Sequence, residues 1–359
     1  MILHMKKFLL SILLLVLAVS PVLAEDVQET KLKGEVTAVN IVDCDEGLGD
    51  EYICYTYDVY IKDTKESVQT MVSILQSSGE SFKVGDAIYL TGMQDLDGND
   101  TWSITSYARN GSILFWLGIF IILVFLIGGK KSLGSILSLF LSFLVLYIFI
   151  IPQIINSGNV IWVGYIGVFI ILTLGMYLAH GFKKQTTIAL VSTYIGVGIV
   201  SVLVLVLMES LHINGMGEET AFLLSSQIGE SLDIQKLFFI SIIISAIGVL
   251  DDVAIGQVSA MYEIYTVDTS IGGKELYRKT MNVGKEHVAS MINTLFIVYA
   301  GSSLSLVMLM YLSNRDIGTL VSIDMISEEI VRTLAISIAL LLVVPISTYI
   351  SAGFLCKGK

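Results

Sequence analysis

Hydrophobic residues follow two different patterns along the chain. From residue 112 onward they form uncharged blocks of roughly 17–25 residues, the length that a helix needs to cross a bilayer. Before residue 110 they alternate with polar residues, which is typical of half-buried strands. The helical blocks predict seven spans, at about 112–128, 132–151, 159–179, 186–208, 237–257, 288–312 and 330–353. We therefore predict an all-α polytopic membrane bundle preceded by a small β domain.

The alternating region, residues 25–110, predicts the β domain. Turn residues such as Asp97-Gly98-Asn99 separate five short stretches of strand character. These stretches are 33–42, 52–62, 67–72, 87–93 and 101–107. Five short strands favour a curled sheet or barrel of the OB or SH3-like kind. Cys44 and Cys54 lie on facing sides of a predicted hairpin. They can form a disulfide, and two free thiols are the alternative.

Residues 1–24 have the pattern of a signal peptide. Lys6 and Lys7 precede an apolar run, and Ala24 offers a small residue at a plausible cleavage point. An uncleaved anchor is the alternative. The predicted organisation is thus a leader or anchor over 1–24, a β domain over 25–110, and a helical membrane domain over 111–359.

Lysine and arginine predict the orientation in the membrane. With the β domain outside, the inner linkers and the C-terminus receive ten basic residues and the outer linkers with their flanks receive three. The inner set is Lys130, Lys131, Lys183, Lys184, Lys274, Arg278, Lys279, Lys285, Lys357 and Lys359, and the outer set is Lys236, Arg315 and Arg332. We expect a bacterial plasma-membrane protein with its β domain outside and its C-terminus in the cytoplasm.

Composition narrows the function classes. Charged residues make up 15% of the 359 positions, against about 25% in an ordinary soluble domain, which argues against a soluble enzyme. The net charge of −11 argues against nucleic acid as a partner. The sequence contains no nucleotide-binding loop, zinc-ligand spacing or Ser/His/Asp arrangement. We expect no enzyme activity and no cofactor, and the lipid bilayer as the main partner.

Two adjacent carboxylates inside a predicted span are the strongest functional signal. Asp251 and Asp252 follow an apolar run that begins at Leu237, which places Asp251 about 21 Å along the helix. A carboxylate in hydrocarbon is costly unless it is paired, protonated or hydrated, so such residues are functional candidates. The alternative is that the helix ends near Gly248, with both carboxylates at the cytoplasmic boundary or in a structural ion pair.

Asp252 shares a helical face with small and polar residues. Steps of three and four positions place Ser241, Ser245, Gly248, Asp252, Gly256, Ser259 and Glu263 on this face. We expect it to meet other helices or water rather than lipid. Ser290, Asn293 and Thr294 of the sixth span are further candidates for a transport pathway. Contacts that hold membrane helices together are the alternative role for these three.

The linker that begins at Gly215-Met216-Gly217-Glu218-Glu219 leads into an amphipathic stretch. This pattern predicts a helix that lies at the membrane surface.

Several ordered motifs over residues 110–353 resemble the YibE/F family of bacterial multi-pass membrane proteins. They include Gly129-Lys130-Lys131-Ser132-Leu133, Gly196-Val197-Gly198, Gly215-Met216-Gly217-Glu218-Glu219, Ile247-Gly248-Val249-Leu250-Asp251-Asp252-Val253-Ala254, Met281-Asn282-Val283-Gly284-Lys285, Asn293-Thr294-Leu295, Tyr299-Ala300-Gly301-Ser302-Ser303 and Glu329-Ile330-Val331-Arg332. Asp252 matches the recurrent acid of the family, whereas many relatives have Met or another residue where Asp251 stands. The resemblance implies an integral membrane protein that is often treated as a transporter.

These observations favour a transporter or permease for a small ion or metabolite, coupled to cations or protons through Asp252. The alternative is a membrane scaffold or sensor whose β domain binds an envelope partner. An intramembrane aspartyl protease ranks last, because Leu250 stands where its motif has glycine and no second span carries an interior Asp. A homo-oligomer or a paired membrane subunit is compatible with the transporter and the scaffold.

Overall fold

The computed structural model describes residues 30–44, 52–62, 64–75, 81–94, 100–129, 132–229, 232–313 and 316–356. The predicted leader over 1–24 lies outside the described residues. The chain falls into two compact units, the first extending to Ile127 and the second covering the helices from Gly128 on. Each unit is described by itself.

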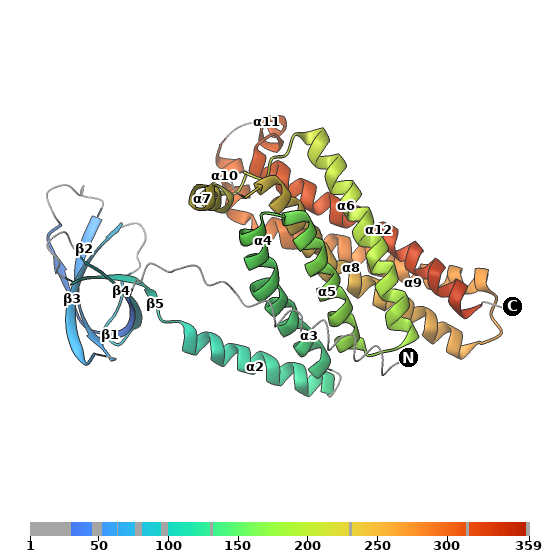
Figure 1. The fold of residues 1–359 in the computed structure, drawn as a ribbon, viewed down its shortest axis with the longest axis horizontal. Coiled ribbons are helices and arrows are strands. Elements are labelled where there is room, and N and C mark those ends of the chain that lie inside the picture. The colour runs from blue at the N-terminus through green and yellow to red at the C-terminus, as the bar shows by residue number, and fades with distance from the viewer. Residues whose placement is uncertain are drawn as a thin grey trace. The chain divides into compact units, whose positions relative to one another are not determined.

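The first unit contains a five-stranded antiparallel sheet (Figure 1). Its strands are β1 (Thr30–Val42), β2 (Tyr52–Ile61), β3 (Glu66–Leu75), β4 (Ala87–Gln94) and β5 (Asp100–Tyr107), in the order β3-β2-β1-β4-β5. The two edge strands approach each other, and the Thr70 hydroxyl of β3 donates to the Trp102 carbonyl of β5 at 2.6 Å. The sheet is therefore nearly closed, which confirms the predicted five-stranded, barrel-like domain.

Alternation along the strands supplies the core of this sheet. Tyr57, Val59 and Ile61 recur with a period of two on β2, and all three are buried with Ile88 and Leu90 of β4. A disulfide joins Cys44, just after β1, to Cys54 on β2, with a Cα–Cα distance of 5.2 Å. The sequence leaves open whether these cysteines are bridged or free, and the structure shows the bridge.

Helix α2 (Asn110–Gly128) follows β5 directly and corresponds to the first predicted span. The Asn110 amide donates to the Tyr89 hydroxyl of β4 at 2.8 Å, which ties the start of the helix to the sheet. All described side chains of α2 are at least partly exposed. An apolar helix with no buried face is what lipid contact requires.

The second unit is a helical bundle (Figure 1). Its long helices are a continuous run from α3 (Ser132–Leu144) through the π-helix η3 (Val145–Ile150) to α4 (Ile151–Ser157), then α5 (Val160–His180), α6 (Lys184–Leu211), α8 (Ile234–Val267) and α12 (Asp324–Leu355). Together with α2 they make six helices in the described chain that are long and apolar enough to cross a membrane. Six of the seven predicted spans are therefore confirmed as single apolar helices.

The remaining predicted span, 288–312, is not one straight helix. It is divided between α9 (Gly273–Ser302) and α10 (Leu304–Leu312), which meet at an angle of 68°. Gly301, Ser302 and Ser303 stand at the break, and the Ser302 hydroxyl donates to the Tyr299 carbonyl at 2.9 Å. Glycine and serine favour helix interruption because glycine is flexible and serine competes for backbone hydrogen bonds.

Two shorter helices, α7 (Glu219–Ile228) and α11 (Ile317–Val321), lie in the linkers before α8 and α12. The helix predicted after Gly215–Glu219 is thus present as α7.

Helices α6, α8 and α12 form the centre of the bundle. Val200, Ile243, Leu250, Ala339 and Val343 are completely buried there. A Cβ added to Gly196 of α6 would lie 2.5 Å from a methyl carbon of Val343, so the glycine allows the two helices to approach closely.

Helix α8 does not end near Gly248. It continues through Asp251 and Asp252 to Val267, over 34 residues. A helix of that length spans about 50 Å, whereas the hydrocarbon core is about 30 Å thick, so part of α8 must extend beyond the core.

Candidate functional site

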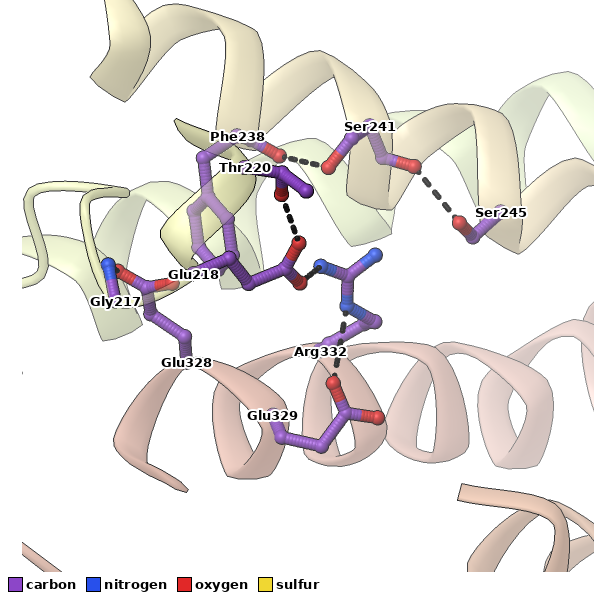
Figure 2. Close-up of polar contacts among 9 residues, drawn as sticks. All are labelled: Gly217, Glu218, Thr220, Phe238, Ser241, Ser245, Glu328, Glu329 and Arg332. Atoms are coloured by element: carbon purple, nitrogen blue, oxygen red, sulfur yellow. Dashed lines mark hydrogen bonds and ion pairs between the residues drawn. The ribbon is translucent and has the colours of Figure 1, made fainter. Parts of the chain in front are cut away.

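A group of four charged residues lies where α12 begins (Figure 2). Glu328, Glu329 and Arg332 project from α12, and Glu218 comes from the residue that precedes α7. The side chain of Arg332 is only 17% exposed. Because burying charge is unfavourable without partners, the packing of this group requires explanation.

The loop between α6 and α7 reaches this group because of its glycines. Gly215 has φ +80°, and a Cβ there would lie 2.8 Å from the Phe238 Cβ of α8. A Cβ at Gly217 would lie 2.7 Å from the backbone nitrogen of Met325. The loop backbone therefore approaches α8 and the first turn of α12 more closely than any side chain would allow.

Two side chains hold this loop from opposite sides. Glu328, which is 3% exposed, accepts a hydrogen bond from the Gly217 N–H at 3.0 Å. Gln235 of α8 donates to the Ile213 carbonyl at 2.9 Å. Asp233 caps the start of α8 beside Gln235, and the Lys236 side chain at 2.7 Å, together with the Lys236 N–H, holds the pKa of Asp233 below its ordinary value.

Arg332 occupies the centre of the group, between two carboxylates (Figure 2). One terminal nitrogen of its guanidinium lies 3.5 Å from Glu218 Oε1, and Nε lies 3.5 Å from Glu329 Oε2. The guanidinium also lies 5.6 Å from the centre of the Phe238 ring, at cation–π distance. Strong charge-assisted hydrogen bonds are about 2.7–2.9 Å long, so both carboxylate contacts are long. The buried Nε has no hydrogen-bond partner in the described structure.

A cavity of about 190 Å³ opens beside the guanidinium. Arg332, Glu218 and Glu328 line it together with the hydroxyl-bearing residues Thr220 and Ser241. Ser241 is the first member of the α8 face that contains Asp252. The cavity thus combines an incompletely bonded cation, two carboxylates and two hydroxyl groups.

A second cavity, of about 260 Å³, lies at the break between α9 and α10. Tyr299, Ser303 and Val307 line it from the broken span, and Glu329 and Thr333 line it from α12. The ion-paired residues Glu329 and Arg332 therefore line different cavities.

The aspartate pair predicted from the sequence lies elsewhere on α8. Asp252 is exposed at the surface of the bundle, and Gly248 and Gly256 on the same face are also exposed, with open space where a Cβ would be. Of the two expected surroundings of this face, other helices or water, the helices of the described chain do not supply the first at these three residues. His180, the last residue of α5, interacts electrostatically with Asp252, which places the carboxylate near the level at which α5 ends. Asp251 is half-buried and accepts a hydrogen bond from the Asp252 N–H at 2.9 Å.

The remaining predicted pathway residues are spread over α8 and α9. Ser259 is half-buried and Glu263 is exposed on α8, and Ser290, Asn293 and Thr294 are exposed on α9. The Thr294 hydroxyl donates to the Ser290 carbonyl at 3.0 Å. Within the described chain, no hydrogen bond joins Asp252 to Asn293, and none of these five residues lines either of the two cavities.

Over the described ranges, no group of three or more His, Cys, Asp or Glu side chains is arranged to hold a metal ion.

The sequence profile described as YibE/F-like protein matches residues 116–357, which is most of the chain. The chain belongs to the YibE/F-like protein family. Comparisons with curated proteins and with solved structures found no match.

The family match includes every residue of the charged group and both cavities, whereas the five strands precede it. Two stretches that support the family resemblance, Gly215–Glu219 and Glu329–Arg332, meet at this group. The sequence places Arg332 among the outer basic residues and in a family motif, and neither observation predicts its contact with Glu218. The sequence does contain a signal for this site, because each stretch places charged residues next to an apolar segment. The pairing itself depends on the fold of the Gly217 loop, which lies 111 positions before Glu328.

Proposed function

We propose that this YibE/F-like protein is a membrane transporter or permease in which the Arg332–Glu329 ion pair controls passage between the two cavities. The proposed substrate is a small ion or metabolite, and no covalent chemistry is involved. The observation that carries the proposal is that two ion-paired residues line different cavities. In the orientation indicated by the lysine and arginine bias, both cavities lie at the outer end of the bundle, and the C-terminus is cytoplasmic.

The long contacts of Arg332 support a role in binding. Its guanidinium carries five N–H donors, and the contacts to Glu218 and Glu329 at 3.5 Å leave these donors poorly used. A polar substrate atom that enters the 190 Å³ cavity could therefore gain charge-assisted hydrogen bonds. Separating an ion pair that is largely shielded from solvent is costly, so the pair stays closed until a substrate, proton or cation compensates for the separation.

The balance of charge supports coupling to a proton or a cation. Three carboxylates, on Glu218, Glu328 and Glu329, surround one arginine. If Arg332 turns toward a substrate, Glu329 loses its nearest positive charge. A proton or cation would then stabilise this carboxylate. Ser241 lines the Arg332 cavity and begins the α8 face that carries Asp252, so this face is the proposed continuation of the pathway.

The interrupted span gives independent support. Irregular backbone at membrane depth is tolerated where it is buried in protein or lines a cavity, and transporters commonly place their sites at broken helices. The break at Ser303 lines the 260 Å³ cavity, opposite Glu329.

The test is flux measurement with the full chain in proteoliposomes. A panel of monovalent and divalent cations, amino acids and organic anions is screened under an imposed pH or sodium gradient. For any substrate found, Arg332→Gln and Glu329→Gln should each reduce flux at least tenfold at equal protein content, and Glu329→Gln should also change its pH dependence. Lys236→Gln is the matched control, because its exposed ion pair with Asp233 lies nearby but outside the cavities.

Equal flux in the Arg332→Gln variant and the wild type would reject the proposed role of the ion pair. Absence of flux for the whole panel, together with specific binding of an envelope component by the β domain, would instead favour the scaffold or sensor.

A further inference from the structure

A larger cavity than either of these two lies at the opposite end of α12. It has a volume of about 610 Å³, within the range of about 300–1,000 Å³ that is usual for ligand sites. The first turns of α9 and the last turns of α12 form its walls. Lys274 and Tyr277 of α9 line the cavity together with Tyr349, Gly353 and Phe354 of α12.

The position of this cavity corresponds to a membrane boundary. Arg332 and Leu355 are 23 positions apart on one helix, a distance of about 34 Å at 1.5 Å per residue. Because the hydrocarbon core is about 30 Å thick, a helix that starts near one boundary at Arg332 reaches the other near Leu355. Tyr349 and Phe354 are 74% and 62% exposed, and exposed aromatic side chains at this level are typical of the interface between hydrocarbon and water.

The chemistry of the cavity is amphipathic. Its walls are mostly apolar, whereas Lys274 brings an exposed ammonium group to the rim. Arg278, one helical turn further along α9, is also exposed. Within the described residues neither cation forms an ion pair, while the neighbouring Lys279 is paired with Glu275 at 3.3 Å. Lys274 at the rim of an apolar cavity, with Arg278 one turn further along the same helix, complements an anionic group attached to a hydrocarbon chain.

We propose that this cavity binds an anionic phospholipid. The headgroup phosphate contacts Lys274 and Arg278, and an acyl chain lies against Tyr349 and Phe354. Basic pockets between transmembrane helices bind anionic headgroups, and the cytoplasmic leaflet supplies such lipids. In the orientation expected from the basic residues, this end of α12 faces that leaflet. The proposal is independent of transport and of the Arg332 group.

Gly353 offers a direct way to fill the cavity. It lines the cavity on α12, and an added Cβ would meet no atom within 4 Å. Gly353→Leu therefore places a bulky side chain in the space assigned to the lipid without a collision in the bundle. Gly198→Leu is the matched control, since Gly198 is also an exposed helical glycine with open space around its Cβ and lies on α6, away from this cavity.

The full chain is purified in detergent and titrated with phosphatidylglycerol, phosphatidylcholine or inorganic phosphate. Bound lipid is counted by native mass spectrometry, and the Tm is measured in parallel. Wild type and Gly198→Leu should retain phosphatidylglycerol and gain thermal stability from it, with little response to phosphatidylcholine or phosphate. Gly353→Leu should lose both effects. Lys274→Gln should bind phosphatidylglycerol about fivefold more weakly, the effect of one basic residue near a membrane surface.

Three outcomes would overturn the proposal. One is unchanged phosphatidylglycerol retention by Gly353→Leu, and another is equal retention of both lipids by the wild type. The third is a dimer that dissociates in Gly353→Leu without any lipid, which would assign the cavity to a second copy of the chain.

Discussion

Glu328 of α12 accepts a hydrogen bond at 3.0 Å from the backbone N–H of Gly217, which lies 111 positions earlier in the chain. Glu328 is buried, and the loop that carries Gly217 also carries Glu218 to Arg332. This single contact therefore fixes the wall of the Arg332 cavity. It also explains how two short motifs, far apart in the sequence, form one site.

Loss of this contact should destabilise the bundle. Glu328→Ala leaves the Gly217 N–H without its partner, which typically costs about 1–3 kcal/mol when the group is buried. Gly217→Ala should be comparably harmful, because its Cβ would collide with Met325 and Glu328. The measurement is the Tm of the purified full chain, followed by intrinsic fluorescence. Both variants should show a clearly lower Tm than the wild type.

The matched controls are Glu328→Gln, which keeps an acceptor oxygen, and Gly198→Ala, which adds a methyl group in open space. The free energy of unfolding of both variants should lie within about 1 kcal/mol of the wild-type value. A Glu328→Ala variant as stable as Glu328→Gln would show that the hydrogen bond does not hold the loop.

A second buried polar contact joins three helices near the other end of the bundle. The Gln257 amide of α8 donates to the Thr280 carbonyl of α9 at 3.0 Å and to the Thr348 hydroxyl of α12 at 2.8 Å. A Cβ at Gly284 would lie 2.7 Å from the Gln257 amide nitrogen. These residues are buried, so the contact and the glycine together set the spacing of the helices.

Gly284→Ala should therefore displace Gln257 and lower the Tm more than Gln257→Leu does. Leucine has a similar size and leaves Thr348 bonded to the Val344 carbonyl, so the expected cost is about 1–2 kcal/mol for the two lost hydrogen bonds of Gln257. The Tm of both variants tests the ranking. A neutral Gly284→Ala would mean that α9 can move away without cost.

The sequence predicts the helices and strands better than it predicts the charged group around Arg332. Long apolar blocks identify six spans because a helix in lipid must be apolar over most of its length. Alternation of apolar and polar residues identifies the five strands because one face of the sheet is buried. The break at Ser303 is missed, since Leu304–Leu312 continues the apolar pattern and hydropathy alone contains no information on direction. The preceding glycine and serines were the available signal.

Asp252 shows what periodicity can and cannot predict about a helical face. Periodicity correctly groups it with Gly248 and Gly256, and all three are exposed together. Periodicity does not say which neighbour covers a face. Leu250 and Val253 are completely buried in the bundle, and this orientation of α8 leaves Gly248, Asp252 and Gly256 exposed. Periodicity also could not predict the contact of Arg332 with Glu218, because the glycine-containing loop between α6 and α7 brings the two residues together.

The disulfide between Cys44 and Cys54 should stabilise the β domain. It closes a segment with a sequence separation of 10, for which the chain-entropy relation gives up to about 3 kcal/mol. The full chain in its oxidised form should show no free thiol at these two positions until it is reduced, and reduction should lower the midpoint of β-domain unfolding in urea. Cys356→Ser provides a background without the remaining cysteine. Two reactive thiols before reduction would contradict the bridge.

Orientation can be tested by labelling single cysteines in a cysteine-free chain. Positions Asn156 and Asp316 should react with a membrane-impermeant reagent in intact cells, because the basic residues are concentrated in the other set of linkers. Positions Lys183 and Lys274 should react only after the membrane is permeabilised. The opposite accessibility at all four positions would invert the proposed orientation and would move the Arg332 cavities to the inner side.

Asp252 provides the last prediction, which concerns coupling. Its carboxylate is exposed on the α8 face that begins at Ser241 in the Arg332 cavity, and it interacts with His180. Because no buried residue of the described chain forms a hydrogen bond or ion pair with its carboxylate, Asp252→Asn should insert and fold at normal abundance. If the carboxylate takes up the coupling proton or cation, this variant should lose gradient-driven flux while substrate still exchanges passively. Asp251→Asn should be milder, since an amide oxygen can still accept the Asp252 N–H. Wild-type driven flux in Asp252→Asn at matched protein content would remove Asp252 from the mechanism and leave Glu329 as the coupling carboxylate.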